Sequence, residues 1–214
     1  MAKLLLHYKL LFNFKKYKNM KTITLELFKF NELSEAAQQK AINEHRNSID
    51  DVLWFFSDDI AEQLKEENIT LSKRGLQYSL NYCQGDGLSF AGEFDVLKMV
   101  KLALPNLSAK RQDIINHCIY KIYSTGNTGR RYCYALKIDI DFEYNHSNWD
   151  EHRYTNLSLL CQKVAEFTEN YYIDLCDKFK KQGYDEIDYQ YSDEGIKETI
   201  IDNDYEFTID GNRY

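Results

Sequence analysis

The clearest candidate for a binding site is a short polar stretch, residues 84–87, with the sequence Gln-Gly-Asp-Gly. The stretch lies between two runs in which apolar and polar residues alternate, so Leu76–Phe94 predicts a β-hairpin with a polar turn. Glycines let a backbone approach a ligand closely, while the Gln amide and the Asp carboxylate supply directional donors and acceptors. The alternative is an ordinary hairpin turn in which the glycines only adopt positive φ. The predicted binding loop comprises Tyr82, Gln84, Gly85, Asp86 and Gly87.

A second group of polar residues could hold a metal ion. Asp139, Asp141 and Glu143 alternate along a predicted strand, so their side chains share one face. Carboxylate oxygens suit Mg²⁺. This strand belongs to a second predicted hairpin, formed by Cys118–Tyr123 and Tyr132–Tyr144. If the two hairpins met, Asp86, Asp139 and Asp141 would fit a metal-dependent phosphodiesterase or nuclease. The alternative is a solvated strand face, because alternating charge is what an exposed face requires. We therefore predict no metal site and no catalytic residue.

Other reactive side chains lack the spacing that chemistry requires. His117, His146 and His152 have no matched metal-ligand spacing. The chain has no Gly-x-Ser-x-Gly elbow and no glycine-rich phosphate loop. Its five cysteines form no Cys-x-x-Cys pair, which fits neither a zinc finger nor a disulfide framework and favours a reducing cytoplasm. The sequence therefore predicts no cofactor.

Alternating and helical spacings predict the elements that must position these residues. Besides the hairpin, strands are predicted at Ile23–Phe30, Cys118–Tyr123, Tyr132–Tyr144 and Tyr205–Ile209. Helices are predicted after the capping residue Ser34 and at Asp51–Glu67, Phe94–Ala103, Ser108–Asn116, Arg153–Lys180 and Asp193–Ile201. These elements indicate an α+β fold, in which a mainly antiparallel sheet of hairpins packs against several helices, including one long helix. Trp54 and Phe55 are expected to widen the buried face of the second helix.

The composition of the chain changes near Met20. Residues 1–19 carry five lysines and no acid. We interpret them as a basic extension, either a leader or a stretch before a true start at Met20, and a basic amphipathic anchor is the alternative. Residues 20–214 are predicted to form a single α+β domain. No apolar run approaches the length of about 18 residues that a transmembrane helix needs, so no membrane span is predicted.

The charge balance limits the kinds of partner. The whole chain has a net charge of −7, and residues 181–214 contain ten Asp or Glu against three Lys or Arg. Such a surface repels nucleic acid and attracts a basic protein surface, so we predict a protein partner; a solvated face is the alternative. Tyrosines of the two hairpins could stack on single-stranded nucleic acid, but an acidic chain disfavours that reading.

Four stretches carry a resemblance to a known family: Phe30–Ala41, Tyr78–Gly87, Ser192–Ile196 and Asn203–Gly211. They resemble a family of small phage and prophage proteins, some of which are labelled as antitoxins of a toxin–antitoxin stability system. The resemblance implies a phage or prophage accessory protein in a bacterial cytoplasm that neutralises a toxin or a host-defence factor. It supplies no catalytic residue. The loop at residues 84–87 and the acidic C-terminal third are the expected contact surfaces, and a metal-dependent phosphodiesterase or nuclease is the competing interpretation.

Overall fold

The computed structural model describes residues 24–126 and 151–214, with side chains from residue 155 onward in the second range. Contacts divide the chain into two compact units. Unit 1 combines the described residues up to Ile49 with Asp193–Tyr214, and unit 2 spans Asp50–Ser192. Each unit has its own hydrophobic core, and the two cores share no residue. The sequence predicts one domain over residues 20–214, whereas the structure groups the described residues in two units.

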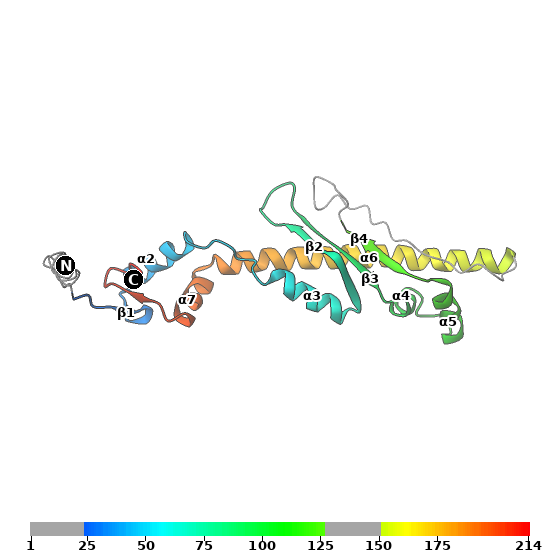
Figure 1. Ribbon diagram of the computed structural model, residues 1–214, viewed down its shortest axis with the longest axis horizontal. Coiled ribbons are helices and arrows are strands. Elements are labelled where there is room, and N and C mark those ends of the chain that lie inside the picture. Colours follow the sequence, from blue (N-terminus) through cyan, green and yellow to red (C-terminus); the bar gives the residue numbers. More distant parts are fainter. Residues whose placement is uncertain (1–23, 127–150) are drawn as a thin grey trace, which may run out of the picture. The chain divides into compact units, whose positions relative to one another are not determined.

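The described part of unit 1 consists of two α-helices, a short 3₁₀ helix and a two-stranded antiparallel sheet around one core (Figure 1). Its elements are β1 (Phe28–Lys29), α2 (Glu35–Arg46), α7 (Asp193–Asp202) and β5 (Glu206–Phe207), with β1 paired to β5. Ser34 caps α2 as predicted, since its Oγ accepts a hydrogen bond from the backbone N of Ala37 at 3.4 Å. The predicted strand Ile23–Phe30 is much shorter within the described residues, because the chain turns into a 3₁₀ helix at Phe30–Glu32.

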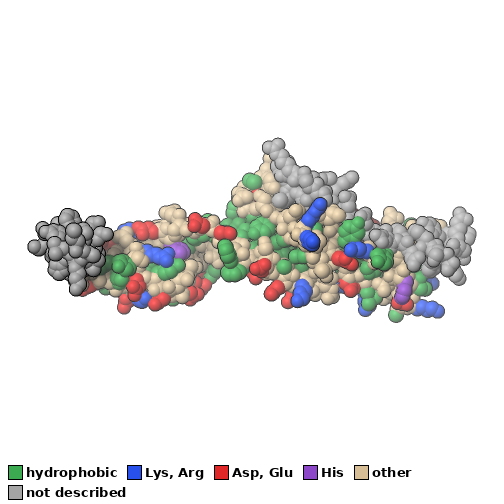
Figure 2. Space-filling model, in the orientation of Figure 1, with side chains coloured by type: hydrophobic (Ala, Val, Ile, Leu, Met, Phe, Trp, Pro, Cys, Tyr) green, Lys and Arg blue, Asp and Glu red, His purple; other side chains and the backbone are tan. Residues whose placement is uncertain are grey.

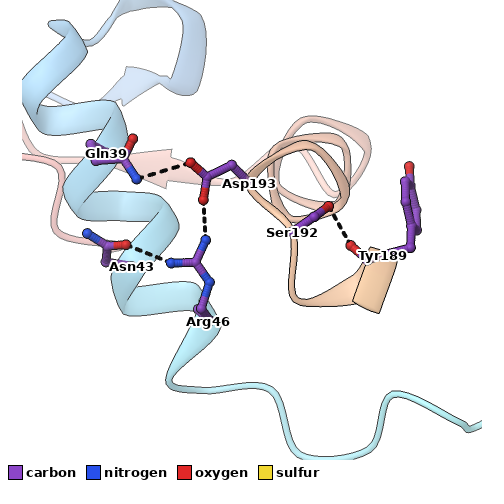
Figure 3. Close-up of polar contacts among 6 residues, drawn as sticks. All are labelled: Gln39, Asn43, Arg46, Tyr189, Ser192 and Asp193. Carbon is purple, nitrogen blue, oxygen red and sulfur yellow. Dashed lines mark hydrogen bonds and ion pairs between the residues drawn. The ribbon is translucent and has the colours of Figure 1, made fainter. Parts of the chain in front are cut away.

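Polar contacts join α2 to the first turn of α7 (Figure 3). The Asp193 carboxylate accepts hydrogen bonds from Gln39 Nε2, at 3.4 Å, and from the Arg46 guanidinium. Arg46 also donates to Asn43 Oδ1 at 2.8 Å, which fixes the guanidinium along α2. A carboxylate at a helix N-terminus is favoured by the helix dipole. The pair therefore stabilises both the start of α7 and its packing on α2.

In the residues of unit 2 that the structure describes, a three-stranded antiparallel sheet is combined with four helices (Figure 1). The strands, in sheet order, are β2 (Ile69–Ser79), β3 (Gly87–Phe94) and β4 (Ile122–Thr125). The helices are α3 (Phe56–Glu66), α4 (Val96–Ala103), α5 (Ala109–Cys118) and α6 (Glu151–Gln190). The predicted α+β fold, its hairpin and its long helix are thus confirmed. A strand predicted to begin at Cys118 is wrong in its start, because α5 continues to that residue and β4 begins at Ile122.

The long helix α6 packs against the sheet of unit 2. The buried ring of Tyr172 lies 4.5 Å from the Phe90 ring, and its hydroxyl donates to the Phe90 carbonyl oxygen at 2.9 Å. Phe179, two turns further along α6, is also fully buried. The helix continues ten residues past the predicted end at Lys180. No helix among the described residues is long and apolar enough to cross a membrane.

Two predictions about the second helix are wrong. Helix α3 begins at Phe56, later than the predicted start at Asp51. Trp54 and Phe55 precede it and are 73% and 67% exposed, whereas they were expected to be buried. Only Phe56 of the three consecutive aromatic residues enters the core. The predicted strand Tyr132–Tyr144 lies outside the described residues.

Candidate functional site

The connection between β2 and β3 is a loop of residues 80–86 that folds around one carboxylate. Asp86 is only 5% exposed. Its Oδ2 accepts hydrogen bonds from the backbone N of Asn81 at 2.7 Å, the backbone N of Cys83 at 3.0 Å and the Tyr184 hydroxyl at 2.6 Å. Its Oδ1 accepts from Ser79 Oγ at 3.2 Å and from Cys83 Sγ at 3.1 Å. Five donors therefore converge on this side chain from the loop, from β2 and from α6.

These hydrogen bonds decide the charge of Asp86. Burial alone would raise the pKa of its carboxyl, but hydrogen bonds from Tyr184, Cys83 and Asn81 hold that pKa well below its usual range. The same contact acts in the opposite direction on the phenol, because burial and the bond to Asp86 raise the pKa of Tyr184 to about 12. Asp86 is therefore an anion that holds the loop in place, and both of its oxygens are already used.

The strained position of the loop is Tyr82, not a glycine. Tyr82 has φ 54°, the left-handed conformation that non-glycine residues rarely adopt, whereas Gly85 and Gly87 do not have positive φ. Contacts with α6 hold Tyr82 there, because its hydroxyl donates to Asp188 Oδ1 at 2.5 Å and its ring lies 4.7 Å from the Tyr184 ring. The bond to Asp188 is the main cause that raises the pKa of Tyr82 to about 12.

The structure splits the predicted binding loop into an exposed part and a buried part. Tyr82 is 61% exposed and Gln84 is also exposed, so both can meet a partner. Asp86 and Gly87 are buried, and Gly85 is half-buried. The Asp86 carboxylate already accepts hydrogen bonds from the loop, from β2 and from α6, so Tyr82 and Gln84 are the residues of the predicted binding loop whose side chains are exposed to a partner.

Trp54 and Phe55, which the sequence predicts to be buried, lie at the same end of unit 2 as Tyr82. A Cβ placed on Gly183 of α6 would lie 2.3 Å from Leu80 Cδ1 and 3.0 Å from Phe56 Cζ. Leu80 begins the loop that carries Tyr82, and Phe56 directly follows the exposed pair, so both segments reach one position on α6. Exposed hydrophobic side chains gather on this part of unit 2 in Figure 2. We call the exposed side chains Trp54, Phe55 and Tyr82 the aromatic surface.

The aromatic surface has acidic surroundings. Between Asp50 and Leu64 the chain has several acids and no Lys or Arg, and Asp51, Asp58 and Asp59 are exposed. Residues 182–192 of α6 and the segment after it also have acids and no base. A signal for this surface was present in the sequence, since three consecutive aromatic residues exceed what one buried face of a helix can hold.

The carboxylates do not form a metal site in the part of the chain that the structure describes. No group of three His, Cys, Asp or Glu side chains in residues 24–126 and 155–214 could hold a metal ion. Asp139, Asp141 and Glu143 lie outside the described residues. His117 lies on the exposed end of α5, where its Nδ1 is 2.7 Å from the carbonyl oxygen of Asp113.

No family model matches the chain, and no curated protein or solved structure gives a significant match.

Proposed function

We propose that this chain is a non-catalytic interaction protein whose aromatic surface binds a basic protein partner. The observation that supports the proposal is the exposure of Trp54, Phe55 and Tyr82 at 73%, 67% and 61%. Trp, Tyr and Phe are enriched at the centres of protein interfaces and supply much of their binding energy. The Trp54 and Phe55 rings lie edge to face, with 6.5 Å between their centroids.

The acids around the aromatic surface indicate the charge of the partner. Asp and Glu residues close in sequence to an exposed apolar surface favour a partner that presents Lys or Arg beside an apolar contact. The same acids repel phosphate, so nucleic acid is disfavoured as the ligand. Within this class, the resemblance to small phage and prophage proteins supports a partner that is a toxin or a host-defence factor. The protein would then act by occupying that factor in the bacterial cytoplasm.

Substitution of the aromatic surface tests this proposal. Trp54→Ala and Tyr82→Ala should each weaken the binding of the partner by about 10-fold to 100-fold, since exposed anchors of this kind cost about 2 kcal/mol when truncated. The partner is captured from the bacterial host with the tagged wild-type chain, identified by mass spectrometry, purified and measured by calorimetry. Raised ionic strength should weaken the binding further, because the acids and the basic partner attract through water.

The matched control is Tyr120→Ala, which removes an aromatic side chain of unit 2 that is 75% exposed and not part of the aromatic surface. This variant should bind as the wild type does. The proposal fails if folded Trp54 and Tyr82 variants bind as tightly as Tyr120→Ala. It also fails if no purified protein that the wild-type chain captures binds it directly.

A further inference from the structure

Unit 1 contains a small pocket that the proposed function does not use. The pocket has a volume of about 230 Å³ and lies between the end of α2 and the C-terminal turn. Its lining comprises Ala41, Glu44, His45, Ser48, Phe207 and Arg213. Two of these side chains, His45 and Arg213, can present N–H groups to the same space. The lining therefore combines polar side chains with the apolar side chains of Ala41 and Phe207.

The C-terminal turn places Arg213 at this pocket. Gly211 has φ 81°, and a Cβ on it would lie 2.3 Å from the carbonyl oxygen of Ala37, so only glycine allows the turn to lie this close to α2. The next residue of the turn, Asn212, is also held against α2, because its Oδ1 accepts a hydrogen bond from Lys40 Nζ at 2.5 Å. An isolated β-bridge between Phe207 and Arg213 then sets the direction of the last residues.

The Arg213 guanidinium is held by stacking and keeps its N–H groups available. Its central carbon lies 3.4 Å from the centroid of the Tyr205 ring, so the guanidinium stacks on that ring. Among the described residues, no hydrogen bond or ion pair engages this guanidinium. A stacked guanidinium presents its edge, which carries the paired N–H donors, in the plane of the group. That edge is what a carboxylate or a phosphate binds.

The other polar groups of the pocket favour an anion. His45 packs against Tyr205 from α2, with 5.9 Å between the ring centroids. Burial, and then the charge of Arg213, lower the pKa of His45, so its ring is neutral at neutral pH and can donate one N–H. Glu44 is the acid that faces the pocket, and its carboxylate lies 3.7 Å from Lys40 Nζ, which offsets its charge.

We propose that this pocket binds a small oxyanion, a carboxylate or a phosphate group, between the Arg213 guanidinium and the His45 ring. The guanidinium supplies two parallel N–H donors, the imidazole supplies a third, and the stacking on Tyr205 fixes their directions before the anion arrives. The site lies within unit 1 and does not depend on the aromatic surface of unit 2. Each proposal therefore stands or falls without the other.

Titration of the full chain with simple anions, followed by NMR of the histidine ring protons, tests this site. Sodium phosphate and sodium acetate are added separately, with sodium chloride at the same ionic strength as the reference. A bound anion stabilises the imidazolium, so we expect a saturable shift of the His45 resonances and a rise in its pKa of about 0.5 or more. The exposed ring of His117 in unit 2 should respond as it does to chloride.

Two variants assign the effect to the guanidinium. Arg213→Gln should abolish the saturable shift, and Arg213→Lys should retain a weaker one, since a lysine keeps the charge but loses the paired donors. A response to phosphate alone, to acetate alone or to both identifies the oxyanion that the site accepts. The proposal is overturned if both salts shift His45 no more than chloride does, or if Arg213→Gln binds as tightly as the wild type.

Discussion

At the scale of single residues, the loop between β2 and β3 depends on Asp86 more than on its glycines. Five donors surround this carboxylate, and one of them comes from Tyr184, 98 residues later in the chain. A buried anion is tolerated only when such hydrogen bonds replace its water. The role of Asp86 is therefore to hold the loop so that Tyr82 and Gln84 remain on the surface.

Replacement of Asp86 should destabilise unit 2. Asp86→Ala leaves buried donors without their acceptor, and we expect a loss of about 3 kcal/mol in the stability of the sheet. Gln84→Ala, which changes an exposed side chain of the same loop, should cost no more than about 0.5 kcal/mol. Hydrogen exchange of the β3 amides measures both values. Equal effects of the two substitutions would contradict the structural role of Asp86.

The stabilisation by Asp86 should also depend on pH. Its pKa is lower in the folded chain than in the unfolded chain, so its contribution is complete above the unfolded value of about 3.9 and is lost as the pH falls below it. The difference in stability between the wild type and Asp86→Ala should therefore be constant near neutral pH and shrink in acid. A difference that stays constant down to acid pH would show that the folded carboxyl has an ordinary pKa.

At the scale of elements, the sequence predicts the helices and strands whose starts and spacing depend on nearby residues. The Ser34 cap, the hairpin and helices α4 and α5 follow from capping, alternation and helical spacing, and the structure contains all of them. The extent of α6 was missed because Gly183 lies inside it, where a glycine is unfavourable. It is needed there because Leu80 packs against its backbone, and no local pattern reveals that contact.

The candidate site was predicted in part for the same reason. The residue types of the loop identified a polar hairpin connection, and Tyr82 and Gln84 are exposed as a contact surface requires. Whether Asp86 faces solvent depends on Tyr184, which the sequence does not place beside it. The exposure of Trp54 depends on where α3 begins, and helix ends are set within a few residues by caps and packing.

Gly211 offers a test of close packing between the C-terminal turn and α2. Gly211→Ala combines a positive φ with a Cβ 2.3 Å from the carbonyl oxygen of Ala37, which is backbone and cannot move aside easily. Gly75→Ala is the matched control, because Gly75 has φ 58° but no atom within 4 Å of the added carbon. We expect Gly75→Ala to cost about 1 kcal/mol and Gly211→Ala to cost about 2 kcal/mol more. Thermal unfolding of each variant checks the difference, and similar costs would contradict the close contact.

At the scale of the whole molecule, two hydrophobic cores raise the question of how many cooperative units the chain has. The core of unit 1 includes Ile196, and the core of unit 2 includes Leu64. Both side chains are at most 1% exposed. A segment that has its own core can unfold by itself, so a single free energy of unfolding need not describe the chain.

Cavities in the two cores should therefore have separate effects. Leu64→Ala and Ile196→Ala each remove buried methyl groups and should cost about 3 kcal/mol. Because the cores share no residue, Leu64→Ala should lower the amide protection of β2 and β3 and leave that of α2 and α7 unchanged, and Ile196→Ala should do the reverse. Hydrogen exchange followed by mass spectrometry resolves both sets of amides in one experiment. If each substitution lowers protection in both units equally, residues 20–214 unfold as the single domain that the sequence predicts, and the two units are parts of one cooperative structure.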